Sequence, residues 1–362
     1  MTTAQRVRRA GLATVAALVI GGSGVAIGAA ATDSSASGTP AAATAPAVPG
    51  PATSKGPGPA SYASVVRQVL PSVVLIRTEN GLGSGVVLDR SGNIVTNAHV
   101  AGNATKFGVQ VAGDTAPRSA RLVGTYPPDD LAVIRADDPS GLQPATFGDS
   151  AKVQAGDVVL AIGNPLGLSG SVTQGIISAT DRAVTEPATD GSPAATLPGA
   201  IQTSAPINPG NSGGALVSAS GQVVGIPTLA AGSPQGGGQA QGIGFAIPSN
   251  LARDIATQII DTGHVTNSHR AAIGAEVATV LGPDGAAGGV GLVAVTSGKG
   301  AERAGLRAGD VITAVAGAQT TDTTALSQAL AAAKPGDTVT VTVSRDGQER
   351  NVQVTLGELP GS

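Results

Sequence analysis

The sequence predicts a mostly β protein with two globular domains, a sandwich or barrel followed by a smaller α+β domain. Two observations predict this fold class. Between residues 61 and 264, short runs of β-branched residues alternate with Gly, Pro and Asp, and helical patterns occur only at the two ends. After a polar stretch at 265–270, further runs of this kind surround one helical pattern. The length of 362 residues accommodates two domains.

The N-terminal segment, residues 1–31, is predicted to be a signal peptide or a membrane anchor. Arg6, Arg8 and Arg9 precede an uncharged apolar run over 10–32, which is long enough to cross a bilayer. The arginines favour a cytoplasmic start, so the rest of the chain is expected outside the cytoplasm. The small residues at 29–31 suit a cleavage site, and both alternatives stay open.

Residues 32–60 are predicted to be a disordered linker. Ala, Pro, Gly, Ser and Thr dominate this segment, and its only large aliphatic residue is Val48. Such a segment cannot bury enough apolar area to offset the entropy lost on ordering. We therefore expect a flexible tether ahead of the first domain.

The first domain, residues 61–264, is expected to contain strands between two helices. The first helix begins near Ser61 and ends at Pro71, and the second is capped by Ser249 and ends at Gly263. The strands expected between them are 73–76, 85–88, 94–96, 131–134, 158–162, 172–177, 222–226 and 243–247.

The second domain, residues 270–358, shows the same kind of pattern on a smaller scale. Its expected strands are 291–295, 311–315, 339–343 and 352–356, and a helix is expected over 324–333. Lys334, Pro335 and Gly336 end that helix. Mixed strands and one helix predict a small α+β domain.

The composition excludes several functional classes. Lys and Arg number 21 against 24 Asp and Glu, a net charge of −3, which argues against a nucleic-acid binder. The chain has no cysteine, which excludes disulfides, thiolate nucleophiles and Cys-ligated metals. It has three histidines, so imidazole chemistry has three candidates: His99, His264 and His269.

The stretch 210–214, Gly-Asn-Ser-Gly-Gly, is the candidate nucleophile region. It could be a plain turn, since these are turn residues. The functional interpretation is a serine, Ser212, on a tight turn whose backbone N–H groups converge where a carbonyl oxygen would become an anion. Gly210 and Ser212 would supply these donors, with Asn211 between them as a third candidate.

A serine hydroxyl needs a base and, behind it, a carboxylate. His99 follows a predicted strand, although it could also be a structural core residue. His264 and His269 flank the domain boundary and are expected to be solvated. Asp130 directly precedes the apolar run 131–134, whereas Asp129 is expected to be a solvated loop residue. The chain order His, Asp, Ser is that of the chymotrypsin-type proteases.

Residues 61–360 resemble the HtrA family of trypsin-like serine proteases, which carry a C-terminal PDZ domain. The matching motifs are 96–100, 130–134, 161–165, 172–179, 201–203, 207–214 and 242–248. The resemblance implies a chymotrypsin-like fold of two packed six-stranded β-barrels, with His99 and Asp130 on the first and Ser212 on the second. It also implies peptide cleavage with no metal and no organic cofactor.

The chain departs from the family pattern at several positions. Ser204 and Pro206 lie near the expected specificity pocket, which leaves the preferred side chain open. Pro227 lacks an N–H that an edge strand could offer to substrate. Asn211 cannot pair with a newly cut amino terminus, so activation is expected to need no such cut. The loops 183–198 and 229–241 are instead expected to be ordered by substrate or partner binding.

The second domain resembles a bacterial-type PDZ domain over 300–312. This resemblance implies that a strand edge and a helix bind a peptide C-terminus. By position, Ile273, Gly274 and Ala275 would form the carboxylate loop and strand. Leu326 and Leu330 would face the groove, and the other interpretation is a stabilising appendage.

The leading hypothesis is therefore a cell-envelope serine endopeptidase that acts on unfolded or damaged proteins and is regulated or targeted by its PDZ domain. The alternative is a peptide-binding scaffold or holdase with incidental proteolysis. Expected partners are polypeptide substrates, peptide C-termini, and the membrane through residues 10–31 if these are retained. The resemblance also implies a homotrimer, although only five aromatic residues are available to build its interface.

Overall fold

A computed structural model describes residues 61–79, 81–164, 170–186, 195–208, 210–232, 239–282 and 285–360. The predicted N-terminal segments, 1–31 and 32–60, lie outside these residues. So do 187–194 and 233–238, the central parts of the two loops expected to respond to substrate. Within the described ranges, no helix is long and apolar enough to span a bilayer.

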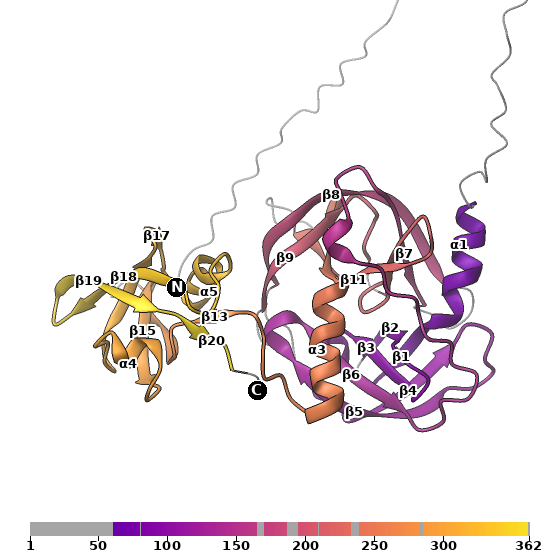
Figure 1. The fold of residues 1–362 in the computed structure, drawn as a ribbon, viewed down its shortest axis with the longest axis horizontal. Coiled ribbons are helices and arrows are strands. Elements are labelled where there is room, and N and C mark those ends of the chain that lie inside the picture. Colours follow the sequence, from indigo (N-terminus) through magenta and orange to yellow (C-terminus); the bar gives the residue numbers. More distant parts are fainter. Residues whose placement is uncertain are drawn as a thin grey trace, which may run out of the picture. The chain divides into compact units, whose positions relative to one another are not determined.

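Six antiparallel strands close into a first barrel in the order β1-β2-β3-β6-β5-β4 (Figure 1). The helix α1 (Tyr62–Val69) and the 3₁₀ turn η1 (Leu70–Ser72) lead into it, and the Ser61 side chain caps α1 by accepting from the Ser64 N–H. The strands are β1 (Val73–Arg77), β2 (Leu82–Val87), β3 (Asn93–Thr96), β4 (Lys106–Val111), β5 (Arg118–Tyr126) and β6 (Leu131–Ala136). The one-turn helix α2 (Ala98–Ala101) follows β3, and η2 (Pro127–Asp129) precedes β6.

A second barrel of the same size closes in the order β10-β11-β12-β9-β8-β7. The turn η3 (Ser150–Lys152) lies between the barrels in the chain. The strands are β7 (Val158–Gly163), β8 (Ser171–Glu186), β9 (Ala195–Thr203), β10 (Ala215–Ser218), β11 (Val223–Gly232) and β12 (Gln239–Pro248). The predicted double barrel is confirmed.

The helix α3 (Ser249–Thr262) packs against both barrels. It packs against β5 and β6 of the first barrel and β11 of the second. Its buried Ile255 joins one apolar cluster with Val133 of β6 and Ile226 of β11. Separation of the barrels would expose this shared core to water, which costs roughly 25 cal/mol per Å² of apolar surface. The core therefore favours one relative position of the two barrels.

The ends of α3 agree only in part with the sequence prediction. Gly263 ends the helix with φ 80°, and its N–H donates to the Ile259 carbonyl, as expected of a C-terminal glycine. The predicted cap by Ser249 is wrong. Ser249 is the first helical residue, and its hydroxyl donates to the Gly148 carbonyl.

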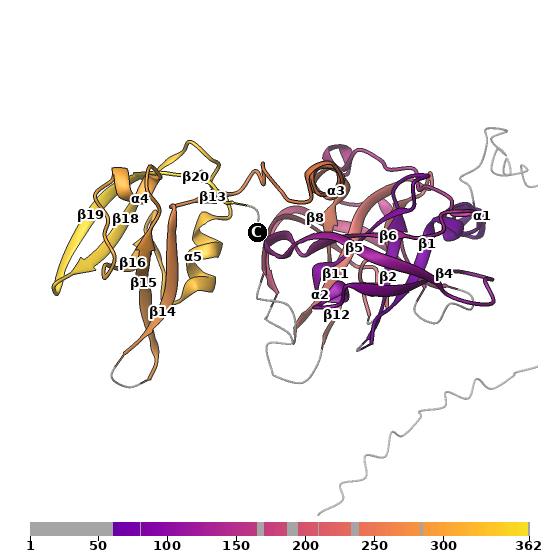
Figure 2. The ribbon, with the colours of Figure 1, turned by 90° about the horizontal axis from the view of Figure 1, so that it is seen from below.

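The C-terminal domain is a sheet in the order β14-β15-β16-β18-β19, with β17 paired to β16. Its elements are β14 (Ala275–Leu281), β15 (Ala287–Val295), α4 (Gly300–Arg303), β16 (Val311–Val315), β17 (Ala318–Gln319), α5 (Thr323–Leu330), β18 (Thr338–Arg345) and β19 (Gln348–Thr355). The helix α5 lies beside β14, the strand at the sheet edge (Figure 2). A separate two-residue ladder joins β13 (Ala271–Ala272) to β20 (Gly357–Glu358).

Candidate active site

His99 and Asp130 form a side-chain pair on the first barrel. His99 lies on α2, and its Nδ1 is 2.8 Å from Asp130 Oδ2. The backbone N–H of His99 also donates to Asp130 Oδ1 at 2.9 Å, so both carboxylate oxygens contact the same residue. The carboxylate is 1% exposed and the imidazole 28%. A buried carboxylate on Nδ1 favours the tautomer that carries its proton on Nδ1, in which Nε2 is the basic nitrogen.

The backbone around Asp130 holds its side chain toward the histidine. Asp130 adopts a left-handed conformation, φ 50°, directly after η2, and its N–H donates to the Pro127 carbonyl. Its own carbonyl accepts from the Ala98 N–H at 3.1 Å and from Asn97 Nδ2 at 3.1 Å. A left-handed conformation costs energy in a residue other than glycine, so it persists only where the surroundings enforce it.

Thr228 joins this pair to Ser212 on the second barrel. The Thr228 hydroxyl donates to Asp130 Oδ2 at 2.6 Å, and the Thr228 carbonyl accepts from Ser212 Oγ at 3.1 Å. The sequence prediction missed Thr228. The ladder between β11 and β12 shifts register between Pro227 and Leu229, and a bulge of this kind re-aims the side chain between them.

Ser84 of β2 makes the reciprocal contact from the first barrel to the nucleophile turn. Its N–H donates to the Ser212 carbonyl at 2.9 Å, and its hydroxyl donates to the Gly210 carbonyl at 2.6 Å. Gly213, with φ 77°, lies so close that a Cβ there would overlap the Ser84 carbonyl oxygen. The turn therefore needs glycine at 213 for both its conformation and this close approach.

The three predicted oxyanion donors behave differently. The N–H groups of Gly210 and Ser212 donate to no acceptor in the described part of the chain. The Asn211 N–H instead donates to the Asn208 carbonyl at 3.0 Å, and its side chain donates to the Pro206 carbonyl at 3.3 Å. Asn211 is thus occupied within the turn, which corrects its inclusion among the donors.

Comparisons with known proteins find two families along this chain. Residues 83–226 match the trypsin-like peptidase domain family, and residues 265–356 match the PDZ domain family. Serine protease PepD of Mycobacterium tuberculosis is 40% identical over 337 residues, which cover 88% of this chain and 70% of PepD. The periplasmic pH-dependent serine endoprotease DegQ of Escherichia coli is 35% identical, over 85% of this chain and 72% of DegQ.

This chain belongs to the HtrA family of trypsin-like serine proteases. A solved structure of the HtrA-type protease AlgW with a decapeptide is 34% identical, with a TM-score of 0.54, over 83% of this chain and 99% of AlgW. The predicted enzyme class, serine endopeptidase, is confirmed by these relatives. No group of metal-ligating side chains occurs among the residues that the structure describes.

A cavity of about 540 Å³ lies between β14 and α5 in the PDZ domain of this HtrA protein, and Pro198 of β9 also lines it. The residues predicted for peptide binding all line it: Ile273, Gly274, Ala275, Leu326 and Leu330. Gly274 has φ 82°, and a Cβ there would overlap the side chain of Lys299. Glycine is therefore required at this point of the predicted carboxylate loop.

Asp129, the neighbour of Asp130, differs from its prediction. It is fully buried, and its Oδ1 accepts from Arg270 Nη1 at 3.0 Å. Burial raises the pKa of Asp129 from 3.8 to about 6, although Arg270 opposes that rise. His264 and His269 are exposed, as predicted.

The raised pKa of Asp129 predicts a pH-dependent stability. The folded state holds this proton more tightly than the unfolded chain, so the stability contributed by this carboxyl falls as the pH rises from about 4 to 6. One pKa unit corresponds to about 1.4 kcal/mol. The free energy of unfolding of Asp129→Asn, minus that of wild type, should therefore rise by about 2–3 kcal/mol between pH 4 and pH 7.

Urea unfolding followed by circular dichroism at several pH values measures this difference. The matched control is Asp261→Asn, an exposed carboxyl on α3, whose difference from wild type should not change by more than about 0.5 kcal/mol. A constant difference for Asp129→Asn across this pH range contradicts the assignment.

Proposed function

We propose that this HtrA protein hydrolyses peptide bonds of unfolded or damaged polypeptides outside the cytoplasm, with Ser212, His99 and Asp130 as its catalytic triad. The observation that carries the proposal is the Thr228 bridge, which connects the carboxylate of the His99–Asp130 pair with the Ser212 hydroxyl. Through Asp130 and Thr228, this chain of hydrogen bonds links residues up to 113 positions apart in the sequence, His99 and Ser212.

The proposed reaction begins with attack of Ser212 Oγ on the substrate carbonyl carbon. The hydroxyl leaves its hydrogen bond to Thr228, and its proton passes to His99 Nε2. Asp130 stabilises the resulting imidazolium, and the N–H groups of Gly210 and Ser212 bind the oxyanion. His99 then returns the proton to the leaving amine. A water molecule then attacks the acyl-enzyme carbonyl and passes a proton to His99, which returns it to Ser212 Oγ as the acyl group leaves.

The extracytoplasmic location is supported by the periplasmic relatives. Within the proposal, residues 10–31 either anchor the protein in the membrane or belong to a cleaved signal peptide. The peptidase domain extends over 61–264 and the PDZ domain over 270–358. A homotrimer is implied by the family resemblance alone.

The PDZ cavity is proposed to bind peptide C-termini, which would regulate or target cleavage. Its position between an edge strand and a helix suits strand addition, in which backbone hydrogen bonds give affinity and an apolar pocket takes the last side chain. The buried Leu326 and Leu330 supply the apolar wall. The AlgW structure with a decapeptide supports a peptide as the ligand of such a protein.

Replacement of Ser212 by Ala should abolish digestion of casein by the full-length protein, with a loss of roughly 10⁴-fold or more, because no other group supplies the nucleophile. The measurement is the rate of release of acid-soluble peptides. The control is Ser220→Ala, an exposed serine in the turn after β10, which should digest casein at the wild-type rate.

Digestion that persists in Ser212→Ala contradicts the triad. Digestion by neither protein favours the scaffold or holdase alternative.

A fluorescent peptide that ends in a free carboxylate and an apolar residue should bind the full-length Ser212→Ala protein. The same peptide with an amidated C-terminus should bind at least about 10-fold more weakly, because hydrogen bonds to a charged group contribute about 1.5–3 kcal/mol. Fluorescence anisotropy measures both affinities on one protein preparation, so protein folding is held constant. Equal affinities contradict carboxylate recognition.

A further inference from the structure

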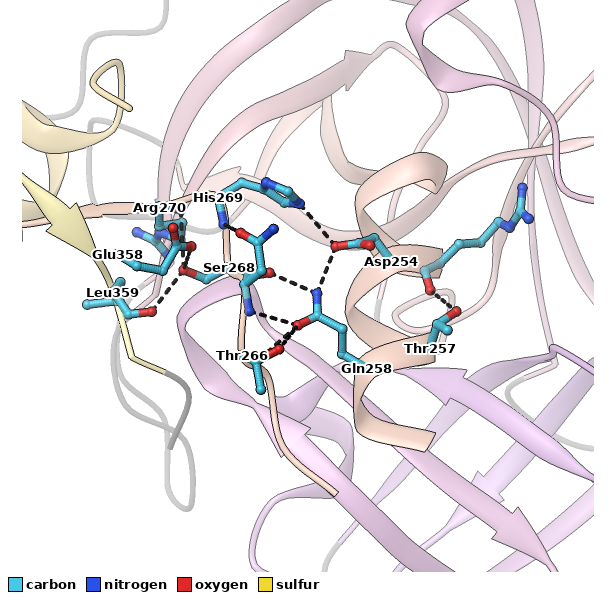
Figure 3. A network of polar contacts seen from close by, with 11 residues as sticks. Asp254, Thr257, Gln258, Thr266, Ser268, His269, Arg270, Glu358 and Leu359 are labelled. Carbon is cyan, nitrogen blue, oxygen red and sulfur yellow. Dashed lines mark hydrogen bonds and ion pairs between the residues drawn. The ribbon is translucent and has the colours of Figure 1, made fainter. Parts of the chain in front are cut away.

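The linker after the peptidase domain, residues 266–270, is held against α3. Gln258 accepts from the Asn267 N–H at 2.8 Å and donates to the Asn267 carbonyl at 2.8 Å. His269 Nε2 lies 3.1 Å from Asp254 Oδ2, and Figure 3 shows Asp254 and Gln258 on the side of the helix that faces the linker. The linker therefore has a defined path across the peptidase domain.

The C-terminal segment of the chain holds the same linker from the other direction. The Leu359 N–H donates to the Arg270 carbonyl at 2.8 Å, which extends the ladder of β13 and β20. Ser268 Oγ lies 2.8 Å from Glu358 Oε1 and 2.9 Å from the Leu359 carbonyl (Figure 3). Hydrogen bonds to the C-terminal segment thus fix the backbone at Arg270 and on both sides of it.

The Arg270 side chain reaches from this linker to η2 of the first barrel. Its Nη1 donates to the Pro128 carbonyl and to Asp129 Oδ1. The Arg270 side chain is 11% exposed and that of Asp129 is 0%. Asp129 Oδ2 has no hydrogen-bond partner among the described residues, so Arg270 is its principal compensating charge. Removal of one partner from a buried ion pair leaves an uncompensated charge.

The turn that Arg270 contacts is the one that sets the conformation of Asp130. Pro128 and Asp129 belong to η2, and Asp130 is its left-handed C-cap. A shift of this turn would move the Asp130 carboxylate relative to both atoms of His99 that it contacts. Misplacement of a catalytic group by about 1 Å can cost roughly 100-fold in rate.

We propose that Arg270 is a positioning residue of the peptidase: its bonds to Pro128 and Asp129 hold η2 in the conformation that aims the Asp130 carboxylate at His99. This inference rests on the proposed role of Asp130 in the triad. It assigns a residue outside the two barrels to the arrangement of the catalytic groups. Arg270 also lines the PDZ cavity, where it could bind the carboxylate of a ligand. The experiment must therefore distinguish ligand binding by Arg270 from positioning of Asp130.

The test measures kcat and KM of the full-length protein on a short internally quenched peptide with an amidated C-terminus, which offers no free carboxylate to the PDZ domain. Active sites are counted with a fluorophosphonate. Arg270→Ala should lower kcat per active site at least about 10-fold with KM within twofold of wild type. Arg270→Lys keeps a charged donor and should recover to within about fourfold. Arg303→Ala, which removes an exposed arginine on α4, is the matched control and should stay within twofold.

A second variant separates positioning from loss of folding. Asp129→Asn/Arg270→Ala lacks the uncompensated buried charge, so it should fold as well as wild type while kcat stays at least about 10-fold low. Recovery of kcat in this double variant overturns the proposal. So does an Arg270→Ala effect that is confined to KM or is equalled by Arg303→Ala. A failure of the triad itself would appear separately, as peptide cleavage by Ser212→Ala.

Discussion

The active site depends on one contact between the barrels, the bridge made by Thr228. One residue of the second barrel bonds the carboxylate of the first barrel through its hydroxyl and the candidate nucleophile through its carbonyl. Neither barrel contains all three residues of the proposed triad, so the proposed mechanism requires the barrels to keep their relative position. The core shared by Val133, Ile226 and Ile255 supplies the apolar part of that constraint.

Ser84 is the centre of the buried polar contacts at the junction. Ser84 is fully buried, yet its hydroxyl donates to Gly210 and accepts from the Asn164 N–H, while its carbonyl accepts from the Thr96 hydroxyl. Each unmade bond in such a place costs about 1–3 kcal/mol, so the network selects one arrangement of the nucleophile turn. Gly213 permits that arrangement because any side chain would meet Ser84.

The sequence indicated the residues of the proposed triad more readily than the residues that position them. His99, Asp130 and Ser212 stood out because histidine is scarce and because glycines surround the serine. Thr228 and Ser84 carry no local signal, since their roles arise from a bulge and from contacts across the junction. Asp129 looked solvated because its partner, Arg270, lies 141 residues away. Strand β9 was missed because Pro198 and Gly199 interrupt its β pattern.

The central claim is that His99 of the first barrel activates Ser212 of the second. Reaction of the folded full-length protein with a fluorophosphonate, followed by mass-spectrometric peptide mapping, tests it most directly. The account predicts one modified residue, Ser212, and its loss in His99→Ala. Modification of a different serine, or undiminished labelling of Ser212 in His99→Ala, would contradict it.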